Sequence, residues 1–210
     1  MPSRFVLVSR CFCCYNEDSR LRVLRYMNMK HFTRGNSLFS LCGLNCGLCS
    51  MRLGGHCGGC GFGNQTCPLT KCSIEHGAIE YCFQCGEYPC EKYDRIDAYD
   101  SFITHQRRKS DLQKAQQIGI ENYTAEQVKK TKILNNLLDC YNDGRKKTLF
   151  CVAVNLLELD ELAEVVKQAD TETQGMPIKE KAAFISSLLQ LCAANKGIEL
   201  KLKKKRGMGI

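Results

Sequence analysis

Ten of the sixteen cysteines in this chain lie between residues 42 and 90. This cluster constrains the fold more than any other feature, because so many thiols in a short segment serve either as disulfides or as metal ligands. Three pairs have the spacing Cys-x-x-Cys, namely Cys46/Cys49, Cys57/Cys60 and Cys82/Cys85. The tight turn within such a pair suits two ligands on one metal better than the ends of two separate bridges. The spacing therefore predicts metal ligation.

Glycine accompanies all three pairs. Gly58, Gly59 and Gly61 surround the second pair, Gly47 lies inside the first, and Gly86 follows the third. A metal-binding knuckle turns its backbone N–H groups toward the thiolates and usually needs a positive φ just after the second cysteine, which glycine adopts without steric cost. The predicted ligands are Cys42, Cys46, Cys49, Cys57, Cys60, Cys67, Cys72, Cys82, Cys85 and Cys90.

Ten thiols do not divide evenly among four-ligand sites. Two zinc sites with four cysteines each leave two thiols over, whereas three sites would need His56 and His76 as additional ligands. A lone histidine is more often a surface residue or a satisfied one than a ligand, so we expect two zinc sites. One site would have the spacing of a zinc ribbon and consist of Cys57, Cys60, Cys82 and Cys85, with the other six cysteines left for the second.

An iron–sulfur cluster is the alternative cofactor. Cys42, Cys46 and Cys49 follow the C-x3-C-x2-C spacing with which radical SAM enzymes hold a [4Fe–4S] cluster. Those enzymes build a long barrel of repeated strands and helices around the cluster, whereas here further cysteines and then a helical pattern follow. Structural zinc is therefore favoured over iron–sulfur.

The composition is that of a folded protein, with 44% hydrophobic residues in 210. No run of eighteen apolar residues occurs, so we expect no membrane-spanning helix. The apolar run near the start, FVLV, is far shorter than the core of a secretory signal. We therefore expect a cytoplasmic protein, in which thiols stay reduced and cysteine clusters hold metal.

Three regions follow from the pattern. Residues 1–28 are expected to be an upstream extension or disordered arm, residues 29–99 a cysteine-rich metal-binding domain, and residues 100–210 a helical domain. The expected fold class is α+β: an irregular, metal-stapled cysteine-rich lobe with short β knuckles, packed on a mainly α-helical lobe of about five helices. We expect the metal to replace the hydrophobic core that some fifty irregular residues cannot build.

Apolar residues at helical spacing mark most of the C-terminal half. They predict helices over residues 101–118, 124–141, 160–169 and 178–196, the second of them opened by a capping box of Thr124 and Gln127. The run at 148–157 fits a helix or a strand, and we favour the helix. Residues 198–202 alternate and predict a short edge strand before a basic tail. Cys140, Cys151 and Cys192 lie on apolar faces and are expected to be buried structural thiols.

No common catalytic motif is present. The sequence has no H-E-x-x-H, no G-x-S-x-G, no Walker A loop and no zinc-deaminase signature, so we name no catalytic residue and lean against an enzyme. The net charge of +8 comes with acidic residues interleaved among the basic clusters. A protein partner is therefore favoured over nucleic acid.

The cysteine block also resembles a known family. The stretches CGLNCGLC, CGGC, C-x4-C, CFQC and EYPCEKY resemble the uncharacterised bacterial and archaeal family called domain of unknown function three thousand seven hundred and ninety-five, with Tyr88 where that pattern usually has phenylalanine. All ten predicted ligands fall on the pattern, whereas His56 and His76 do not. The resemblance covers about residues 29–170 and implies a metal-binding cysteine-rich domain without an established reaction.

The favoured function is thus a structural-zinc module for protein interaction. The alternatives are an iron–sulfur redox protein or metalloenzyme and, third, a nucleic-acid-binding accessory protein.

Overall fold

The computed structural model describes residues 32–62 and 67–204, and within these ranges the chain is helical and contains no β-strand. The predicted upstream extension, residues 1–28, lies outside them. The α-helices are α2 (Ser50–Leu53), α3 (Pro68–Glu75), α4 (Arg108–Ile118), α5 (Ile120–Cys140), α6 (Lys147–Leu156), α7 (Leu159–Glu172) and α8 (Ile178–Ala194). Three short 3-10 helices are η1 (Cys46–Leu48), η2 (Cys82–Gln84) and η3 (Glu91–Tyr93). The predicted α+β fold class is therefore wrong.

Helical turns take the place of the predicted β knuckles. The backbone N–H of Cys49 donates to the carbonyl of Cys46 at 3.2 Å, and that of Cys85 donates to the carbonyl of Cys82 at 3.0 Å. These two Cys-x-x-Cys turns thus satisfy their backbone by a local i to i+3 bond and need no partner strand.

The predicted C-terminal strand is absent for a similar reason. Lys201 N–H bonds the carbonyl of Glu199 at 2.8 Å, so the segment bends instead of extending. The segment is anchored by the backbone of Lys203, which exchanges hydrogen bonds of 2.7 Å with the carboxylate and the N–H of Asp100, and by Gln106, which donates to the carbonyl of Lys201 at 3.5 Å.

The predicted helices of the C-terminal half are confirmed, with shifted starts. α4 ends at Gly119, whose φ of 85° suits a residue without a side chain, and residues 147–156 form a helix as expected. α5 begins at Ile120, ahead of the predicted capping box. The box prediction is wrong because Thr124 lies inside the helix, where its hydroxyl accepts a hydrogen bond of 3.0 Å from Asn36.

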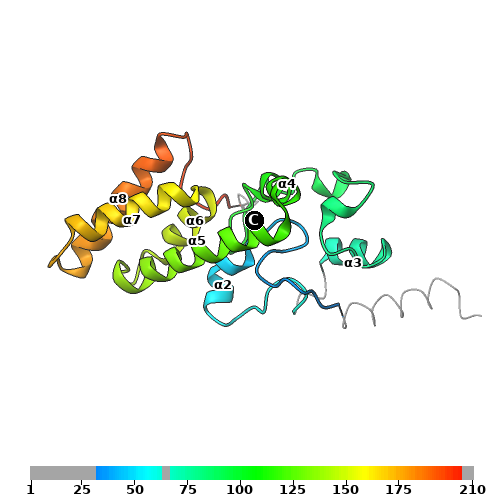
Figure 1. The fold of residues 1–210 in the computed structure, drawn as a ribbon, viewed down its shortest axis with the longest axis horizontal. Helices are drawn as coiled ribbons and strands as arrows, with labels where there is room; N and C mark the ends of the chain where they lie inside the picture. The colour runs from blue at the N-terminus through cyan, green and yellow to red at the C-terminus, as the bar shows by residue number, and fades with distance from the viewer. Residues whose placement is uncertain (1–31, 63–66, 205–210) are drawn as a thin grey trace, which may run out of the picture.

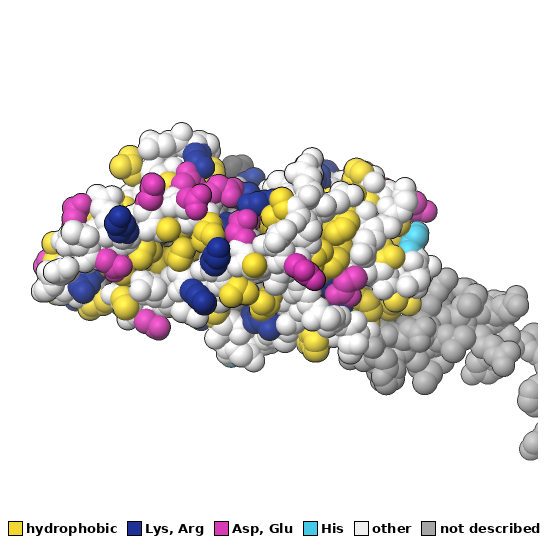
Figure 2. All heavy atoms as spheres, in the orientation of Figure 1, with side chains coloured by type: hydrophobic (Ala, Val, Ile, Leu, Met, Phe, Trp, Pro, Cys, Tyr) yellow, Lys and Arg dark blue, Asp and Glu magenta, His cyan; other side chains and the backbone are white. Residues whose placement is uncertain are grey.

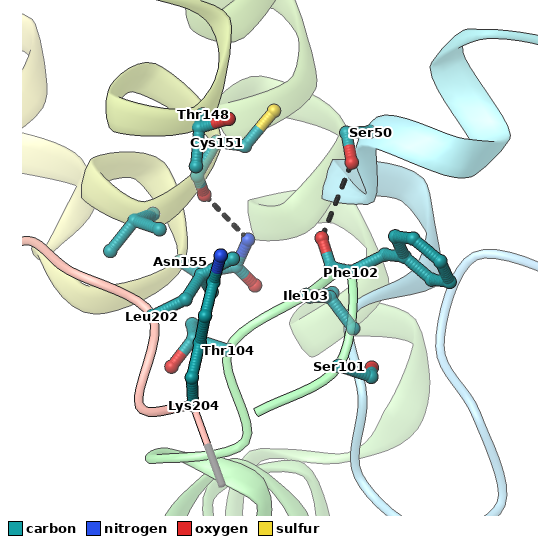
Figure 3. A pocket seen from close by; sticks show the side chains of 11 residues that line it. Ser50, Ser101, Phe102, Ile103, Thr104, Thr148, Cys151, Asn155, Leu202 and Lys204 are labelled. Atoms are coloured by element: carbon teal, nitrogen blue, oxygen red, sulfur yellow. Dashed lines mark hydrogen bonds between the residues drawn. The ribbon is translucent and has the colours of Figure 1, made fainter. Parts of the chain in front are cut away.

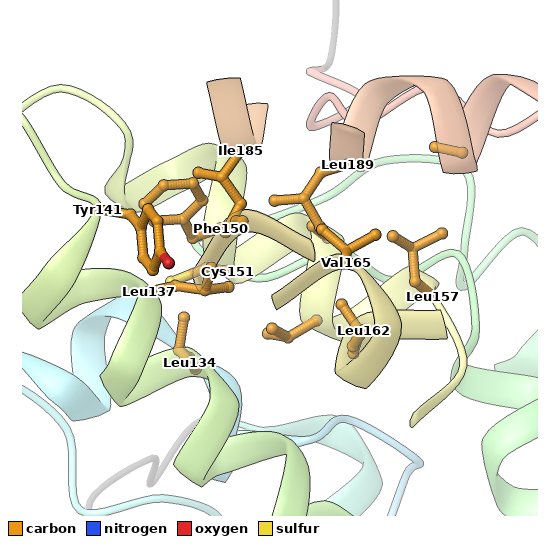
Figure 4. Packing of buried hydrophobic residues seen from close by; sticks show 14 of the residues in the cluster. Leu134, Leu137, Tyr141, Phe150, Cys151, Leu157, Leu162, Val165, Ile185 and Leu189 are labelled. Carbon is orange, nitrogen blue, oxygen red and sulfur yellow. The ribbon is translucent and has the colours of Figure 1, made fainter. Parts of the chain in front are cut away.

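The helical region, which we define as residues 100–204, has a core formed by α5 to α8. Leu137 of α5, Phe150 of α6, Leu162 of α7 and Ile185 of α8 are fully buried and point toward one another (Figure 4). Nearly all of α6 is buried, which explains why its sequence shows a continuous apolar run instead of a helical stripe.

The cysteine-rich region, defined as residues 32–99, packs around a second hydrophobic core, to which α4 and α5 also contribute. Phe39 packs its ring against Tyr81 and Tyr123 at centroid distances of 5.8 and 4.6 Å, and Leu41 and Leu69 are buried beside them. The expectation that metal replaces a missing core is therefore wrong. Apolar and aromatic packing already orders this region.

The two regions share both cores, as expected for halves that pack together. Leu48 of η1 lies in the core of the helical region, whereas Leu112 of α4 and Tyr123 of α5 lie in the core of the cysteine-rich region. α5 runs through the middle of an elongated molecule, with α3 near one end and α8 near the other (Figure 1). None of the helices in the described ranges is long and apolar enough to cross a membrane.

Candidate metal centre

Four cysteines line one small cavity at the edge of the cysteine-rich region. We call Cys72, Cys82, Cys85 and Cys90 the Cys82 group. The cavity has a volume of about 20 Å³, close to that of a single water molecule or ion. Apart from the hydroxyls of Ser73 and two tyrosines, the remaining lining is apolar. Thiols from three separate segments therefore surround a space for one small ligand.

Local structure positions each of these cysteines. Cys72 lies one turn into α3, which begins at Pro68, and Cys82 starts η2 with Cys85 directly after it. The N–H of Cys82 donates to the carbonyl of Leu41 at 2.9 Å, which ties η2 to the core. The rings of Tyr88 and Tyr93 meet edge to face at 4.9 Å on the side of Cys90.

The hydroxyl of Tyr93 is left without a hydrogen-bond partner among the described atoms. Tyr93 is only 2% exposed and lines the cavity, and the sulfur that faces its hydroxyl is that of Cys82. Burial raises the pKa of Tyr93, and it raises the pKa of the Cys82 thiol to about 12. Buried hydroxyls are nearly always paired, so a thiolate at Cys82 would supply the missing acceptor.

A second set of thiols surrounds the loop that carries Cys42. We call Cys42, Cys46, Cys49 and Cys60 the Cys42 group. Burial, together with the nearby sulfurs of the other three members, raises the pKa of Cys46 to about 12, although the backbone N–H of Cys60 lies close enough to lower it. The N–H of Leu41 faces the sulfur of Cys60 in the same way. Amide groups aimed at sulfur are the feature expected of a metal-binding knuckle.

The loop that carries Cys60 is held by Arg52 and by glycine. Arg52 donates to the carbonyls of Gly58 and Ser37, the latter at 3.2 Å. Gly59 has a φ of 94°, and a Cβ there would lie 2.6 Å from the carbonyl oxygen of Ser37. Gly61 follows Cys60 with a φ of 90°, so the predicted positive φ after the second cysteine is confirmed at this pair. Gly86, after the third pair, does not have it.

Two buried arginines accompany the Cys42 group. Arg108 of α4 donates from Nη2 to the sulfur of Cys42 at 2.6 Å, and the hydroxyl of Ser40 lies 3.2 Å from the same sulfur. Arg34 lies beside Cys60, where its charge acts to lower the pKa of that thiol against the effect of burial, and it pairs with Glu80 at 3.3 Å. Both positive charges favour thiolates over thiols.

The thiols in each group gather without converging on one point. In the residues the structure describes, all cysteines are free thiols, and no three or more Cys, His, Asp or Glu side chains are arranged as ligands of one ion. The donor set nevertheless fits a thiophilic cation, because four sulfurs surround an ion-sized cavity with an unpaired hydroxyl beside it. A change of the cysteine χ1 rotamer redirects sulfur without moving the backbone.

The structure groups the cysteines differently from the ribbon spacing. Cys82 and Cys85 share a cavity with Cys72 and Cys90, and not with Cys57 and Cys60. Cys57 is exposed, with its sulfur 3.4 Å from the N–H of Gly59, and Cys67 precedes α3. These two are the thiols left over when eight are divided between two groups.

Of the two histidines that we weighed as ligands, His76 lies beside a thiol of the Cys82 group, with its Nδ1 3.7 Å from the sulfur of Cys72. His56 is exposed, and no thiol contact is recorded for it among the described residues. His76 has its Nδ1 at 2.9 Å from the carbonyl of Cys72 and its Nε2 at 3.5 Å from Glu87. These two contacts raise the pKa of His76, and they occupy both ring nitrogens.

Sequence reasoning missed Arg34, Tyr93 and Arg108. Nothing in the local pattern identifies them as neighbours of a thiol group. Arg108, for example, belongs to a run of basic residues, which is typical of a solvent-exposed surface. Only its 8% exposure identifies it as part of a thiol group. Of the three cysteines predicted to be buried in the helical region, Cys151 is buried, Cys192 is half-buried and Cys140 is exposed.

A larger cavity of about 240 Å³ lies between α2, α6, the loop at 101–104 and the C-terminal segment (Figure 3). Its polar groups are largely used internally. Ser50 donates to the carbonyl of Phe102 at 3.2 Å, and Asn155 donates to the carbonyl of Cys151 at 2.7 Å. This cavity brings together no set of catalytic side chains.

Comparison with known proteins adds no relative. No family model, curated protein or solved structure matches the chain.

Proposed function

We propose that this chain is a structural zinc protein, a metal-binding member of the family that its cysteine block resembles, with two tetrathiolate sites formed by the Cys82 group and the Cys42 group. The observation that carries the proposal is the cavity of about 20 Å³ lined by four cysteines and by the unpaired hydroxyl of Tyr93. A reducing compartment such as the cytoplasm, in which thiols remain available to metal, belongs to the same proposal.

The size of the cavity favours a single ion over a cluster. A [4Fe–4S] cluster brings four irons and four sulfides, whereas the space between these thiols accommodates about one water-sized ligand. Zn²⁺ needs only that space and takes four thiolates at about 2.3 Å in tetrahedral geometry. Four protein ligands also leave no open position for a substrate, which supports a structural role over a catalytic one.

We propose another protein as the partner of this module. On the face seen in Figure 2, Lys and Arg side chains are scattered among Asp and Glu and form no continuous basic band, which argues against a nucleic-acid groove. Next to the junction of the two regions, Tyr99 and Phe102 are 47% and 64% exposed. Exposed aromatic side chains of this kind are enriched where proteins meet.

The test is the metal content of the full chain purified without oxygen. We expect two zinc ions per chain, and one fewer in Cys82→Ser because three thiolates hold zinc more weakly than four. Cys140→Ser is the matched control: Cys140 is exposed and belongs to neither group, so two ions should remain. A wild-type chain that binds no metal, or whose ten cysteines are bridged in pairs, contradicts the proposal. If the preparation contained iron and inorganic sulfide, the cofactor would be the iron–sulfur cluster and not zinc.

A further inference from the structure

Arg108 is a buried cation that no carboxylate pairs in the described part of the chain. It is 8% exposed and opens α4. Its Nη2 donates to the sulfur of Cys42 at 2.6 Å, its Nη1 donates to the carbonyl of Ile96 at 3.4 Å, and its Nε has no partner among the described atoms. Burying a charge without a counter-charge costs several kcal/mol. An anion is therefore expected where the guanidinium points.

The neighbouring charges are committed elsewhere. Arg107, the next residue, pairs with Asp111 at 3.3 Å and with Glu158 at 2.6 Å. Arg34 has Glu80 as its carboxylate partner, and its Nε is also without a partner among the described atoms. The group that faces Arg108 is the sulfur of Cys42, and a neutral thiol would leave the cation uncompensated.

A metal ion resolves this imbalance. Four thiolates around one divalent cation carry a net charge of −2, which supplies the negative charge that the guanidinium of Arg108 lacks. We infer that Cys42, Cys46, Cys49 and Cys60 bind one divalent thiophilic cation such as Zn²⁺, and that Arg108 is the positioning residue and counter-ion of this centre. This inference rests on the proposed function, since it assigns a positioning residue and counter-ion to one of its two sites.

The placement of Arg108 also ties the centre to the helical region. A Cβ at Gly43 would overlap the carbonyl oxygen of Arg108 and approach Leu112 at 2.9 Å, so the loop after Cys42 lies directly against α4. Gly43 has a φ of 93° that favours glycine. The loop that carries Cys42 is therefore held in register with α4 by close packing and by the guanidinium together. Binding of the metal should fix this junction.

The experiment compares Arg108→Met with Lys109→Met in the full chain. Both substitutions remove one positive charge from α4, but Lys109 is exposed and forms a surface ion pair with Asp97, at 3.8 Å. Each is made in the Cys82→Ser background, so that the Cys42 group supplies the remaining site. The chains are loaded with Co²⁺, whose thiolate charge-transfer absorption reports the ligand set, and release of the metal to a chelator is timed.

We expect release to be at least about 10-fold faster in Arg108→Met than in Lys109→Met, because a hydrogen bond to a charged group is worth about 1.5–3 kcal/mol and 1.4 kcal/mol is tenfold. Arg108→Lys keeps the charge but not the planar fork and should fall between them. This variant also serves as the test if Arg108→Met fails to fold.

The two proposals fail in different ways. If Cys82→Ser retains one tightly bound metal and Arg108→Met and Arg108→Lys release it at the rate of Lys109→Met, the role of Arg108 is overturned while the proposed function stands. If the wild-type chain binds one metal and Cys82→Ser binds none, the site at the Cys42 group is overturned and the cavity site remains. A wild-type chain without metal overturns both.

Discussion

Each thiol group is bordered by a polar side chain that the apolar core alone does not satisfy. Tyr93, beside the Cys82 group, keeps its hydroxyl in an almost fully buried position. Arg108 likewise keeps its guanidinium in a buried position beside the Cys42 group. In each case phenylalanine or leucine would fill the space at a lower desolvation cost. The polar group is stabilising only if the sulfur that faces it carries negative charge.

This argument predicts opposite effects of Tyr93→Phe with and without metal. In the metal-free protein the substitution removes an unpaired buried hydroxyl, and stability should stay the same or rise slightly. In the zinc-loaded protein it removes a hydrogen bond to the Cys82 thiolate, and we expect a loss of about 1–2 kcal/mol. Urea unfolding with zinc and with a chelator measures both values.

Tyr99→Phe provides the control for this prediction. Tyr99 is 47% exposed, so loss of its hydroxyl should change stability by less than about 0.5 kcal/mol in either state. If Tyr93→Phe had the same effect with and without zinc, Tyr93 would be an ordinary core residue without a role at the metal.

At the scale of elements, the sequence pattern correctly predicted those elements that are held by hydrogen bonds between residues close in sequence. The helix at 147–156 forms as expected, since its hydrogen bonds lie within a few residues, whereas the Cys46/Cys49 and Cys82/Cys85 turns are helical and are not the predicted β knuckles. The predicted capping box at Thr124 does not form, because the Thr124 hydroxyl accepts a hydrogen bond from Asn36, which is distant in sequence. The strand at 198–202 failed because alternation alone does not provide a neighbouring strand.

The division of the cysteines into groups was beyond the sequence for the same reason. Cys82 lies near the Cys42 loop because its N–H bonds the carbonyl of Leu41, forty-one residues earlier. Spacing within a pair cannot reveal such a bond. The pairs were therefore predicted correctly as local turns, but their partners were not.

The junction of α4 and α7 depends on Arg107. Its guanidinium bridges Asp111 on its own helix and Glu158, the residue before α7, and also donates to the carbonyl of Leu156 at 3.1 Å. Burial acts to raise the pKa of Glu158, but the hydrogen bond and charge of Arg107, with help from Lys130 and Lys114, outweigh it and leave that pKa below its ordinary value.

This lowered pKa predicts a pH-dependent effect of Glu158→Gln. A carboxylate whose pKa is lower in the folded than in the unfolded chain stabilises the fold fully above the unfolded value, ordinarily about 4.3, and loses that contribution as the pH falls through the folded value. We expect Glu158→Gln to reduce stability by under about 1 kcal/mol at pH 7, since the group is partly exposed and screened.

The difference from wild type should shrink as the pH falls below about 4, and urea unfolding at pH 7 and at successively lower pH measures it. Glu164→Gln, on the exposed face of α7, should match wild type at every pH. A Glu158→Gln variant that differed from wild type equally at all these pH values would show that Arg107 does not favour the ionised form of Glu158.

On the scale of the whole molecule, one turn joins the proposed metal ligands to the core of the helical region. Leu48 lies between Cys46 and Cys49, is completely buried, and belongs to the core of the helical region, where η1 packs against α5 and α6. Its carbonyl accepts a hydrogen bond of 3.4 Å from Asn155 of α6. A Cys-x-x-Cys turn with its middle residue in another core cannot move independently of that core. The two regions should therefore unfold together.

Leu48→Ala tests this coupling. The substitution creates a cavity in the core of the helical region, and we expect a loss of about 2–5 kcal/mol. Far-UV circular dichroism reports the helices, and tyrosine fluorescence reports on the cysteine-rich region through Tyr81, Tyr88, Tyr93 and Tyr99, four of the eight tyrosines in a chain without tryptophan. Both signals should shift by the same amount in one transition, because Leu48 lies in the cysteine-rich region and packs in the core of the helical region.

Leu191→Ala is the control for this prediction. Leu191 is 60% exposed on α8, so both signals should report a stability within about 0.5 kcal/mol of wild type. If the two signals showed separate transitions and Leu48→Ala shifted only the helical one, packing of Leu48 in the helical core would not stabilise the turn between Cys46 and Cys49.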